Sequence, residues 1–354
     1  MPPPLPSQDT GAGLLRPGRT GLLLVAGALV ATLVVPLYFG GEAALRATLS
    51  LSAGGYAALF ALILASWIAR TLKLQLLLRR MGVEVGFVQV FEISLATDFG
   101  FLATPAGLGG YAASVYYARR AGASTSAAAA LTAADQALDL VFFALVLPVA
   151  GLAYFGTALP ARLVTAALAT SAALAAIASA LWIAQRQWRG WPAAWQRVGS
   201  RWPRLQRAVG EFRAQAAAQA RVLLGGGPAF LGSVFVLTVL QWMTRYGILW
   251  LVLVLLGCPV SFWLLLALQA LVLHVAQWSG VPAGGGGAEL GLTASLATWV
   301  PAATLATALL LWRLVTLYLA LGAGAVAIAR LARRHAPPAA TTHDPRAAQA
   351  APLD

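Results

Sequence analysis

Long apolar runs separated by short polar or glycine-rich stretches are the dominant pattern of this chain. Apolar runs of roughly 18 residues or more predict transmembrane helices, and the lack of alternating apolar and polar positions within them argues against a β-barrel. We therefore predict an all-α polytopic membrane protein whose transmembrane domain occupies residues 21–329. Six full spans are expected, at 21–41, 51–69, 126–155, 163–184, 229–256 and 302–329.

Two further apolar segments, 88–118 and 262–300, each contain an interruption of similar sequence. The first reads TPAGLGGYAA and the second VPAGGGGAEL, and five of six positions agree when Pro105 is set against Pro282. Glycine costs a helix roughly 1 kcal/mol relative to alanine, and proline cannot donate its backbone hydrogen bond, so both helices should break here. Each segment should then form a broken or re-entrant helix pair that returns the chain to the membrane face it left.

Broken helices in corresponding halves of a membrane protein are typical of transporter binding sites. In lipid, such a break persists only where protein or a water-filled cavity satisfies the freed backbone groups. We therefore predict a substrate site between the two breaks. The residues expected to contribute to it from the breaks are Pro105, Gly107, Gly109, Gly110, Pro282, Gly284, Gly286 and Gly287.

The distribution of basic residues predicts the orientation of the spans, because cytoplasmic loops carry an excess of Lys and Arg. Arg119 and Arg120 follow the first broken segment, whereas the connection before the second, 257–261, is uncharged. The first segment should enter from the cytoplasmic face and the second from the outer face, so that the halves 21–155 and 163–329 form an inverted-topology repeat. By the same rule, four parts of the chain should be cytoplasmic. They are the tail 1–20, the cations Arg70, Lys73, Arg79 and Arg80 after the second span, the loop 185–228 and the tail 330–354, which is also expected to be disordered.

The composition narrows the possible functions. The net charge is +13, and Cys258 is the single cysteine, which leaves no disulfide framework and no Cys-based metal site. In a soluble protein this basicity would suggest nucleic acid, but here the cations flank the spans and indicate topology. The loop 185–228 combines arginines with a tryptophan stripe and predicts an amphipathic helix in the headgroup layer, interrupted at Pro192 and Pro203. It would either favour anionic lipid or serve as a plain interfacial anchor.

Charged residues inside the spans are the candidate functional side chains, because each costs roughly 2.5–3.5 kcal/mol on insertion scales. Asp135 and Asp139 lie one helical turn apart in the third span, where they would contact substrate, carry protons or clamp helices together. Arg313 lies at a similar depth in the last span, and we predict that it pairs with the face formed by Asp135, Gln136 and Asp139. Glu289 follows the second glycine run at a helix start, either as an N-terminal stabiliser or as a contact to a headgroup or cation.

Four other polar residues of the apolar segments are weaker candidates. Asp98 lies nearer the first break than Glu92 and is the better site residue of the two. Arg245 and His274 are isolated in sequence, and each is expected to snorkel or to be hydrogen-bonded. No nucleophile–base pair and no metal-ligand spacing is present, so no catalytic residue, metal or cofactor is expected.

Three stretches together resemble a known family. These are TPAGLGGYAASVYYARRAGASTSAAAALTAADQALDL, SGVPAGGGGAELG and LLLWRLVTLYLALG. They are similar to the transmembrane region of lysylphosphatidylglycerol synthases and its stand-alone, flippase-like relatives, over most of residues 50–330. In the second half Pro282, the glycines, Glu289 and Arg313 match the family pattern. In the first half Gln136 replaces an expected Arg, and Gly110 and Tyr111 stand where a Glu is expected.

The resemblance implies a lipid translocator of a bacterial-type inner membrane, moving a phospholipid or polyprenyl-linked headgroup and binding anionic lipid. The synthases' catalytic domain would follow the membrane region, whereas this chain ends at Asp354 after a short tail; we therefore expect no aminoacyl transfer and no enzyme activity. One alternative is a small-solute or proton-coupled transporter on the same scaffold. Another is a non-transporting membrane partner of a separate glycosyl- or aminoacyl-transferase. A homodimer is also compatible with the many small residues on the spans.

Overall fold

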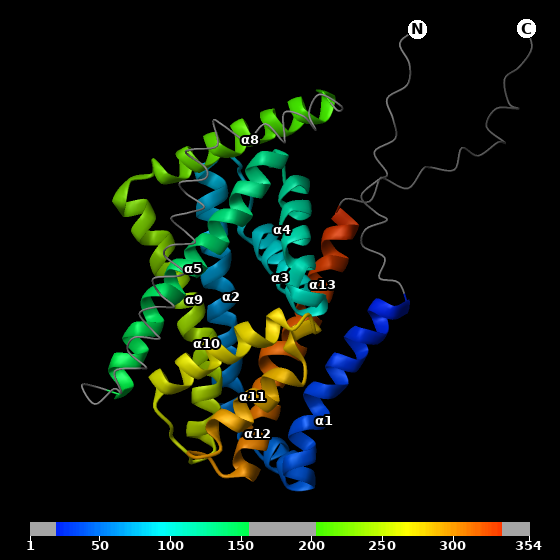
Figure 1. Ribbon diagram of the computed structural model, residues 1–354, viewed down its shortest axis with the longest axis vertical. Helices are drawn as coiled ribbons and strands as arrows, with labels where there is room; N and C mark the ends of the chain where they lie inside the picture. Colours follow the sequence, from blue (N-terminus) through cyan, green and yellow to red (C-terminus); the bar gives the residue numbers. More distant parts are fainter. Residues whose placement is uncertain (1–18, 156–202, 335–354) are drawn as a thin grey trace, which may run out of the picture.

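The computed structural model describes residues 19–155 and 203–334, and every regular element in these ranges is a helix (Figure 1). Five helical stretches are long and apolar enough to cross a membrane: Val25–Leu49, Ala53–Arg80, Thr125–Ala153, Gly227–Leu255 and Ala302–Arg334. The prediction of an all-α polytopic membrane protein is thus confirmed. The sixth predicted span, 163–184, and the first part of the predicted loop, 185–202, lie outside the described residues.

The first two helices run antiparallel. Helix α1 (Arg19–Leu49) contains Pro36 and bends at Gly41, whose φ is 53°. Helix α2 (Ala53–Arg80) begins at a Ser52 cap, whose hydroxyl accepts the Gly55 N–H at 3.1 Å, and ends before Gly82. The predicted end of this span at residue 69 is wrong, because leucines continue the apolar pattern to Leu78 and nothing breaks the helix. Arg70 and Lys73 are therefore buried inside α2 rather than in a cytoplasmic loop.

Both predicted breaks are present, and they have the same local conformation. The first separates α3 (Phe87–Ala103) from α4 (Leu108–Arg120) by the short turn η3 (Pro105–Gly107). The second separates α10 (Phe262–Trp278) from α11 (Gly287–Leu296) by η6 (Pro282–Gly284). Ala106 and Ala283 have φ values of 51° and 53°, and they are the only non-glycine residues with positive φ in the described part of the chain. Since a left-handed alanine costs roughly 1–2 kcal/mol, its occurrence at equivalent positions supports the internal repeat of the breaks.

The remaining described helices complete the bundle. They are α5 (Thr125–Phe155), α8 (Pro203–Leu224), α9 (Gly227–Leu255), α12 (Ala302–Arg313), the π-helical turn η7 (Leu314–Tyr318) and α13 (Leu319–Arg334). Helix α2 packs along α9, α1 along α12, and α13 along α3. The largest apolar core lies where α2, α9 and α12 meet, and includes Leu59, Ile63, Leu249, Val252, Leu253 and Leu309.

Helix α8 lies across one end of the bundle, at the top of Figure 1, and its described part starts at Pro203. Its Leu223 is buried against the bundle, whereas Phe212 is exposed. Arg80 at the end of α2 donates to the carbonyl oxygens of Val222 and Gly225, at 3.1 and 3.0 Å. A cation at the carboxyl end of a helix is favourable for the helix dipole, so this contact fixes α8 on the end of α2.

The two hairpins approach each other through their breaks. In Figure 1 the α3–η3–α4 hairpin lies in the upper half of the bundle and α10–η6–α11 in the lower half, and η3 contacts η6. A Cβ at Gly107 would lie 2.9 Å from the Gln277 side-chain nitrogen, so the first break lies directly against the end of α10. The opposed membrane orientation of the two halves remains a prediction.

A glycine-to-alanine pair tests how closely the arms of the first hairpin pack. A Cβ at Gly100 on α3 would lie 2.5 Å from the Gly109 carbonyl oxygen on α4, whereas a Cβ at Gly322 on α13 would meet nothing within 4 Å. We expect Gly100→Ala to lower the free energy of unfolding by about 1–3 kcal/mol through overpacking. Gly322→Ala should raise it by about 0.5–1 kcal/mol through helix propensity. Thermal unfolding in detergent measures both, and equal melting temperatures for the two variants would contradict this account.

Candidate functional site

A buried cluster of charges joins four helices beside the first hairpin. We call it the α5 charge cluster: Arg70 and Lys73 of α2, Asp98 of α3, Asp135 and Asp139 of α5, and Arg245 of α9. Arg70 and Lys73 are three residues apart and so project from one helical face, as do Asp135 and Asp139 at a spacing of four. The cluster contains three cations and three carboxylates and is formally neutral.

Asp98 ties the first arm of the hairpin to the helices around it. Its carboxylate accepts from Arg70 Nη1 and, through the other oxygen, from Arg245 Nη1 at 2.9 Å. Asp98 and Arg70 are both nearly inaccessible to solvent. Removing either partner of such a pair would leave an uncompensated buried charge, so α3 is held to α2 and α9 at a point just before its break.

Lys73 is the most deeply buried cation of the cluster, with a side chain that is 0% exposed. Its Nζ lies 2.7 Å from Asp135 Oδ1 as an ion pair, and it donates to Asp139 Oδ1 at 3.0 Å. Asp135 also accepts from Arg70 Nη2 at 3.1 Å, and Asp139 from the Trp242 indole N–H at 2.9 Å. Asp139 depends on Lys73 as its only cationic partner among the described residues.

A second buried ion pair lies beside the second hairpin. Arg313 at the end of α12 donates through Nε to Glu289 in the first turn of α11, and the two side chains are 4% and 0% exposed. The Arg313 guanidinium also stacks over the Trp312 ring, 4.5 Å from its centroid. One polar atom on each side of the pair, Arg313 Nη2 and Glu289 Oε2, is buried without a hydrogen-bond partner in the described part of the chain. This pair therefore has unused hydrogen-bonding capacity in the interior.

The predicted pairing of Arg313 with Asp135, Gln136 and Asp139 is wrong. Asp135 and Asp139 pair with Arg70 and Lys73, and Arg313 pairs with Glu289. The physical reason is that α2 continues for more than two turns beyond its predicted end and brings two cations to α5. Glu289 lies in the first turn of α11, at a helix start as predicted, and pairs with Arg313. Its contact to a headgroup stays a prediction.

A neutral pair occupies the first-half position that corresponds to Arg313. The offset of 177 residues that aligns Pro105 with Pro282 places Gln136 at the position of Arg313. Gln136 accepts a hydrogen bond from the Tyr111 hydroxyl at 3.3 Å. By the same offset Glu289 aligns with Ala112, and Tyr111 lies one residue before that position. The first half thus has a neutral contact near the place where the second half has an ion pair.

The glycines of the two breaks serve either close packing or a left-handed backbone, since φ is positive at Gly107, Gly284 and Gly286. A Cβ at Gly109 or Gly110 would collide with Thr104 or Phe101, and one at Gly284 would lie 2.7 Å from Ala276. At Gly286 the nearest atom, from Ala31 of α1, would be 3.5 Å away, and Gly287 is also loosely surrounded. Pro282 is buried in the second break, whereas Pro105 is exposed in the first.

The amino termini of the two second arms differ in how they are capped. Thr104 Oγ1 accepts the Gly109 N–H at 2.7 Å in the first turn of α4. The N-cap residue of α11 is Gly286, and no side chain within residues 19–155 and 203–334 caps this helix. The first-turn amides of a helix have no partner within the helix, so the start of α11, next to Arg313, is the more open anion site of the two.

The remaining candidates have structural partners. Glu92 pairs with Arg334 at 3.2 Å, and Arg245 is paired with Asp98 rather than snorkelling. The His274 ring nitrogen Nδ1 lies 2.6 Å from the Ala270 carbonyl oxygen, which confirms a hydrogen-bonded histidine. Among the residues that the structure describes, no group of three His, Cys, Asp or Glu side chains could hold a metal ion.

Two comparisons with known proteins cover this region. A protein-family model described as the lysylphosphatidylglycerol synthase TM region matches residues 22–324. A UPF0104 membrane protein of Archaeoglobus fulgidus is 23% identical over 284 residues, which cover 76% of this chain and 84% of that relative. The range matched by the family model contains both breaks, the α5 charge cluster and the Glu289–Arg313 pair.

Proposed function

Since this chain belongs to the family of the lysylphosphatidylglycerol synthase transmembrane region, we propose that it is a lipid translocator. It would move a phospholipid or polyprenyl-linked lipid with an anionic headgroup between the two leaflets. The observation that carries the proposal is that two broken hairpins meet through their breaks, each with buried ionic contacts beside it. Irregular backbone at membrane depth needs protein or a polar cavity around it. A headgroup that crosses the bilayer needs a polar path through the same region.

The second hairpin offers the better headgroup site. Arg313 Nη2 is buried without a partner, and the uncapped start of α11 lies beside it. A phosphate could accept hydrogen bonds from Arg313 and from the first-turn amides, as phosphates do at helix amino termini. The phosphate would then compete with Glu289 for Arg313. Exchange of these two partners would couple headgroup entry to release of α11 from α12.

Reconstitution into vesicles tests the proposal. Vesicles containing a fluorescent anionic phospholipid in both leaflets are treated with an impermeant quencher, which reaches only the outer leaflet. If the purified chain translocates lipid, quenching should proceed beyond the outer-leaflet fraction. Vesicles with Gly322→Ala protein should behave like wild type, and protein-free vesicles should stop at that fraction. Wild-type vesicles that also stop there would contradict lipid translocation.

The orientation proposed for the chain follows from its basic helix ends. Helices α2, α4 and α13 end in Arg79–Arg80, Arg119–Arg120 and Arg333–Arg334, and these ends lie near α8 at the upper end of Figure 1. We propose that this is the cytoplasmic face of a bacterial-type inner membrane, with both chain termini on the same side. Accessibility of single cysteines at Arg120 and Ser50 to an impermeant thiol reagent, in a Cys258→Ser background, would distinguish the two faces.

A proton-coupled transporter is a second candidate, favoured by one feature of the α5 charge cluster. Asp139 shares Lys73 with Asp135, and its side chain is the most accessible of the three carboxylates, at 14%. A proton on Asp139 would leave Lys73 paired with Asp135 alone. If coupling occurs here, a pH gradient should accelerate translocation in wild-type vesicles and not in Asp139→Asn vesicles. Equal responses of the two proteins would argue against it.

A further inference from the structure

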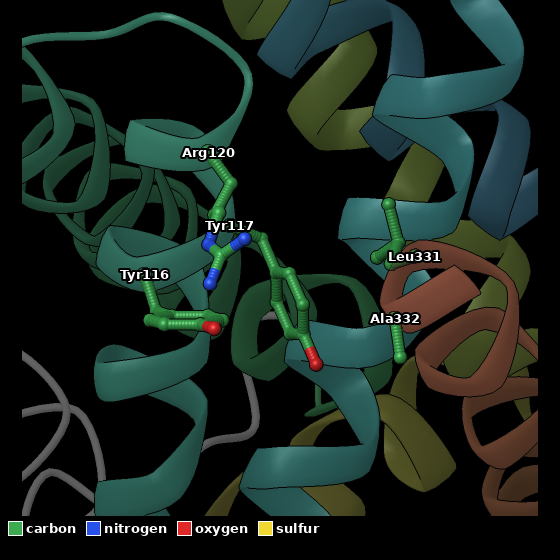
Figure 2. Close-up of a pocket in the computed structure, with 5 residues that line it drawn as sticks. All are labelled: Tyr116, Tyr117, Arg120, Leu331 and Ala332. Atoms are coloured by element: carbon green, nitrogen blue, oxygen red, sulfur yellow. The ribbon is translucent and has the colours of Figure 1, made fainter. Parts of the chain in front are cut away.

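A small cavity at the basic end of the bundle lies apart from both charge sites. Its volume is about 210 Å³, and it is lined by Tyr116, Tyr117 and Arg120 of α4 and by Leu331 and Ala332 of α13. Figure 2 shows the arginine and the two tyrosine rings projecting from α4 toward the gap, with the two aliphatic side chains of α13 opposite. We propose that this cavity binds the phosphate of an anionic phospholipid with a small headgroup.

Arg120 supplies the charge for this site. Its guanidinium lies over the Tyr116 ring, 5.4 Å from the centroid, and no carboxylate within the described ranges pairs with it. Stacking on an aromatic face orients the guanidinium while leaving its N–H donors free for a phosphate. The hydroxyl groups of Tyr116 and Tyr117 add two further donors on the same helix end. Arginine with nearby hydroxyl donors is well suited to phosphate, which accepts several hydrogen bonds at once.

The surroundings favour an anion with an apolar tail. Arg119, Arg330 and Arg333 are exposed and unpaired with any carboxylate among the described residues, so the field at this end is positive. Leu331 and Ala332 give the cavity an aliphatic wall, and both α4 and α13 end here in the basic layer. A juxtamembrane cluster of this kind attracts anionic lipid by roughly 1 kcal/mol per basic residue.

The size of the cavity limits the headgroup. Sites for drug-sized ligands have volumes of roughly 300–1,000 Å³, so about 210 Å³ accommodates a phosphate and its ester oxygens. Phosphatidic acid, whose headgroup is a bare phosphate, fits this limit. Phosphatidylcholine is disfavoured, because its trimethylammonium cation would lie beside the Arg120 guanidinium. The cavity shares no residue with either charge site.

Native mass spectrometry of the full-length protein in detergent, titrated with phosphatidic acid, tests the inference. We expect Arg120→Gln to weaken the tightest phosphatidic acid binding about tenfold, because one charge-assisted contact is lost. Arg333→Gln is the matched control: it removes an exposed arginine at the same end that does not line the cavity, and it should weaken binding by a smaller factor than Arg120→Gln, because it reduces only the general positive field. Tyr117→Phe should weaken binding by a smaller factor, and phosphatidylcholine should not compete. Thermal unfolding should be unchanged for all three variants.

Several outcomes would overturn the inference. Equal affinities of Arg120→Gln and Arg333→Gln would show that binding is only diffuse attraction to a basic surface. Displacement of phosphatidic acid by an equal concentration of inorganic phosphate would identify a soluble phosphate site instead of a lipid site. The double variant Arg313→Met with Glu289→Gln should retain this binding while losing translocation, so failure of the lipid site and failure of the proposed function are separately visible.

Discussion

Replacing Lys73 by methionine is expected to lower the free energy of unfolding by about 3–5 kcal/mol, because removal of one partner leaves buried carboxylates uncompensated. The Lys73 side chain is 0% exposed and lies between Asp135 and Asp139, at 2.7 and 3.0 Å. Methionine preserves the length of the side chain and its apolar stem, so the change is mainly one of charge. Thermal or denaturant unfolding in detergent micelles gives the measurement.

Two matched variants separate the buried pair from a general effect of charge. Arg79→Met removes an exposed cation from the same helix, and surface substitutions are usually within about 0.5 kcal/mol of wild type. The double variant Lys73→Met with Asp139→Asn removes the cation together with the carboxylate that has no other cationic partner. It should regain much of the lost stability, since exchanging a whole buried pair for neutral groups is often nearly neutral. Equal melting temperatures of Lys73→Met and Arg79→Met would contradict the assignment of Lys73 to a buried cluster.

The breaks could be predicted from sequence because their cause is local. Proline removes a backbone donor and consecutive glycines weaken the helix, whatever surrounds them. The structure places a left-handed alanine at the same point of both copies, at Ala106 and Ala283. The all-helical class and the five described spans could also be predicted from local sequence, because they depend on the length of the apolar runs.

The partners of the buried charges could not be predicted, because they depend on how far each helix extends and which face it turns inward. Arg70 and Lys73 resemble the cations that end a span, and the positive-inside rule assigned them to a loop. The signal that could have placed them correctly is the run of leucines after them, which extends to Leu78 before Gly82. A helix that continues to Arg80 must bury two cations near the middle of the bundle, where only carboxylates can compensate them.

The two halves of the chain use their breaks differently. Beside the first hairpin three carboxylates are compensated by three cations, one of them Arg245 of α9, and Gln136 forms a neutral contact with Tyr111. Among the described residues, Arg70 Nε and Asp135 Oδ1 are buried there without a hydrogen-bond partner, so the difference between the halves lies in the number of ion pairs and in the capping of the second arm. In the second half Arg313 has one carboxylate partner and one unpartnered nitrogen beside an uncapped helix start. The first hairpin therefore has the features of a fixed scaffold. The second has the features of a site that can exchange a partner for a ligand.

Neutralising both members of the Glu289–Arg313 pair is expected to abolish most lipid translocation while leaving the fold intact. Arg313→Met alone should be destabilised by about 3–5 kcal/mol, because Glu289 is left buried and unpaired. In the double variant with Glu289→Gln the buried charge is gone, so stability should largely return. Translocation should nevertheless stay at least about tenfold below wild type, because the charge-assisted hydrogen bonds to a phosphate contribute roughly 1.5–3 kcal/mol each.

Gln136→Met is the control from the other half of the chain, since it changes the residue that corresponds to Arg313 and removes only a neutral hydrogen bond at 3.3 Å. It should lose roughly 0.5–1.5 kcal/mol of stability and keep wild-type translocation in the vesicle assay. If the stable double variant translocates lipid as fast as wild type, Arg313 is a structural residue and the headgroup must bind elsewhere. If Gln136→Met translocates lipid as slowly as the double variant, the two halves contribute equally to translocation. The distinction between a scaffold hairpin and a binding hairpin would then be wrong. Only a defect confined to the second half agrees with a headgroup that replaces Glu289 on Arg313.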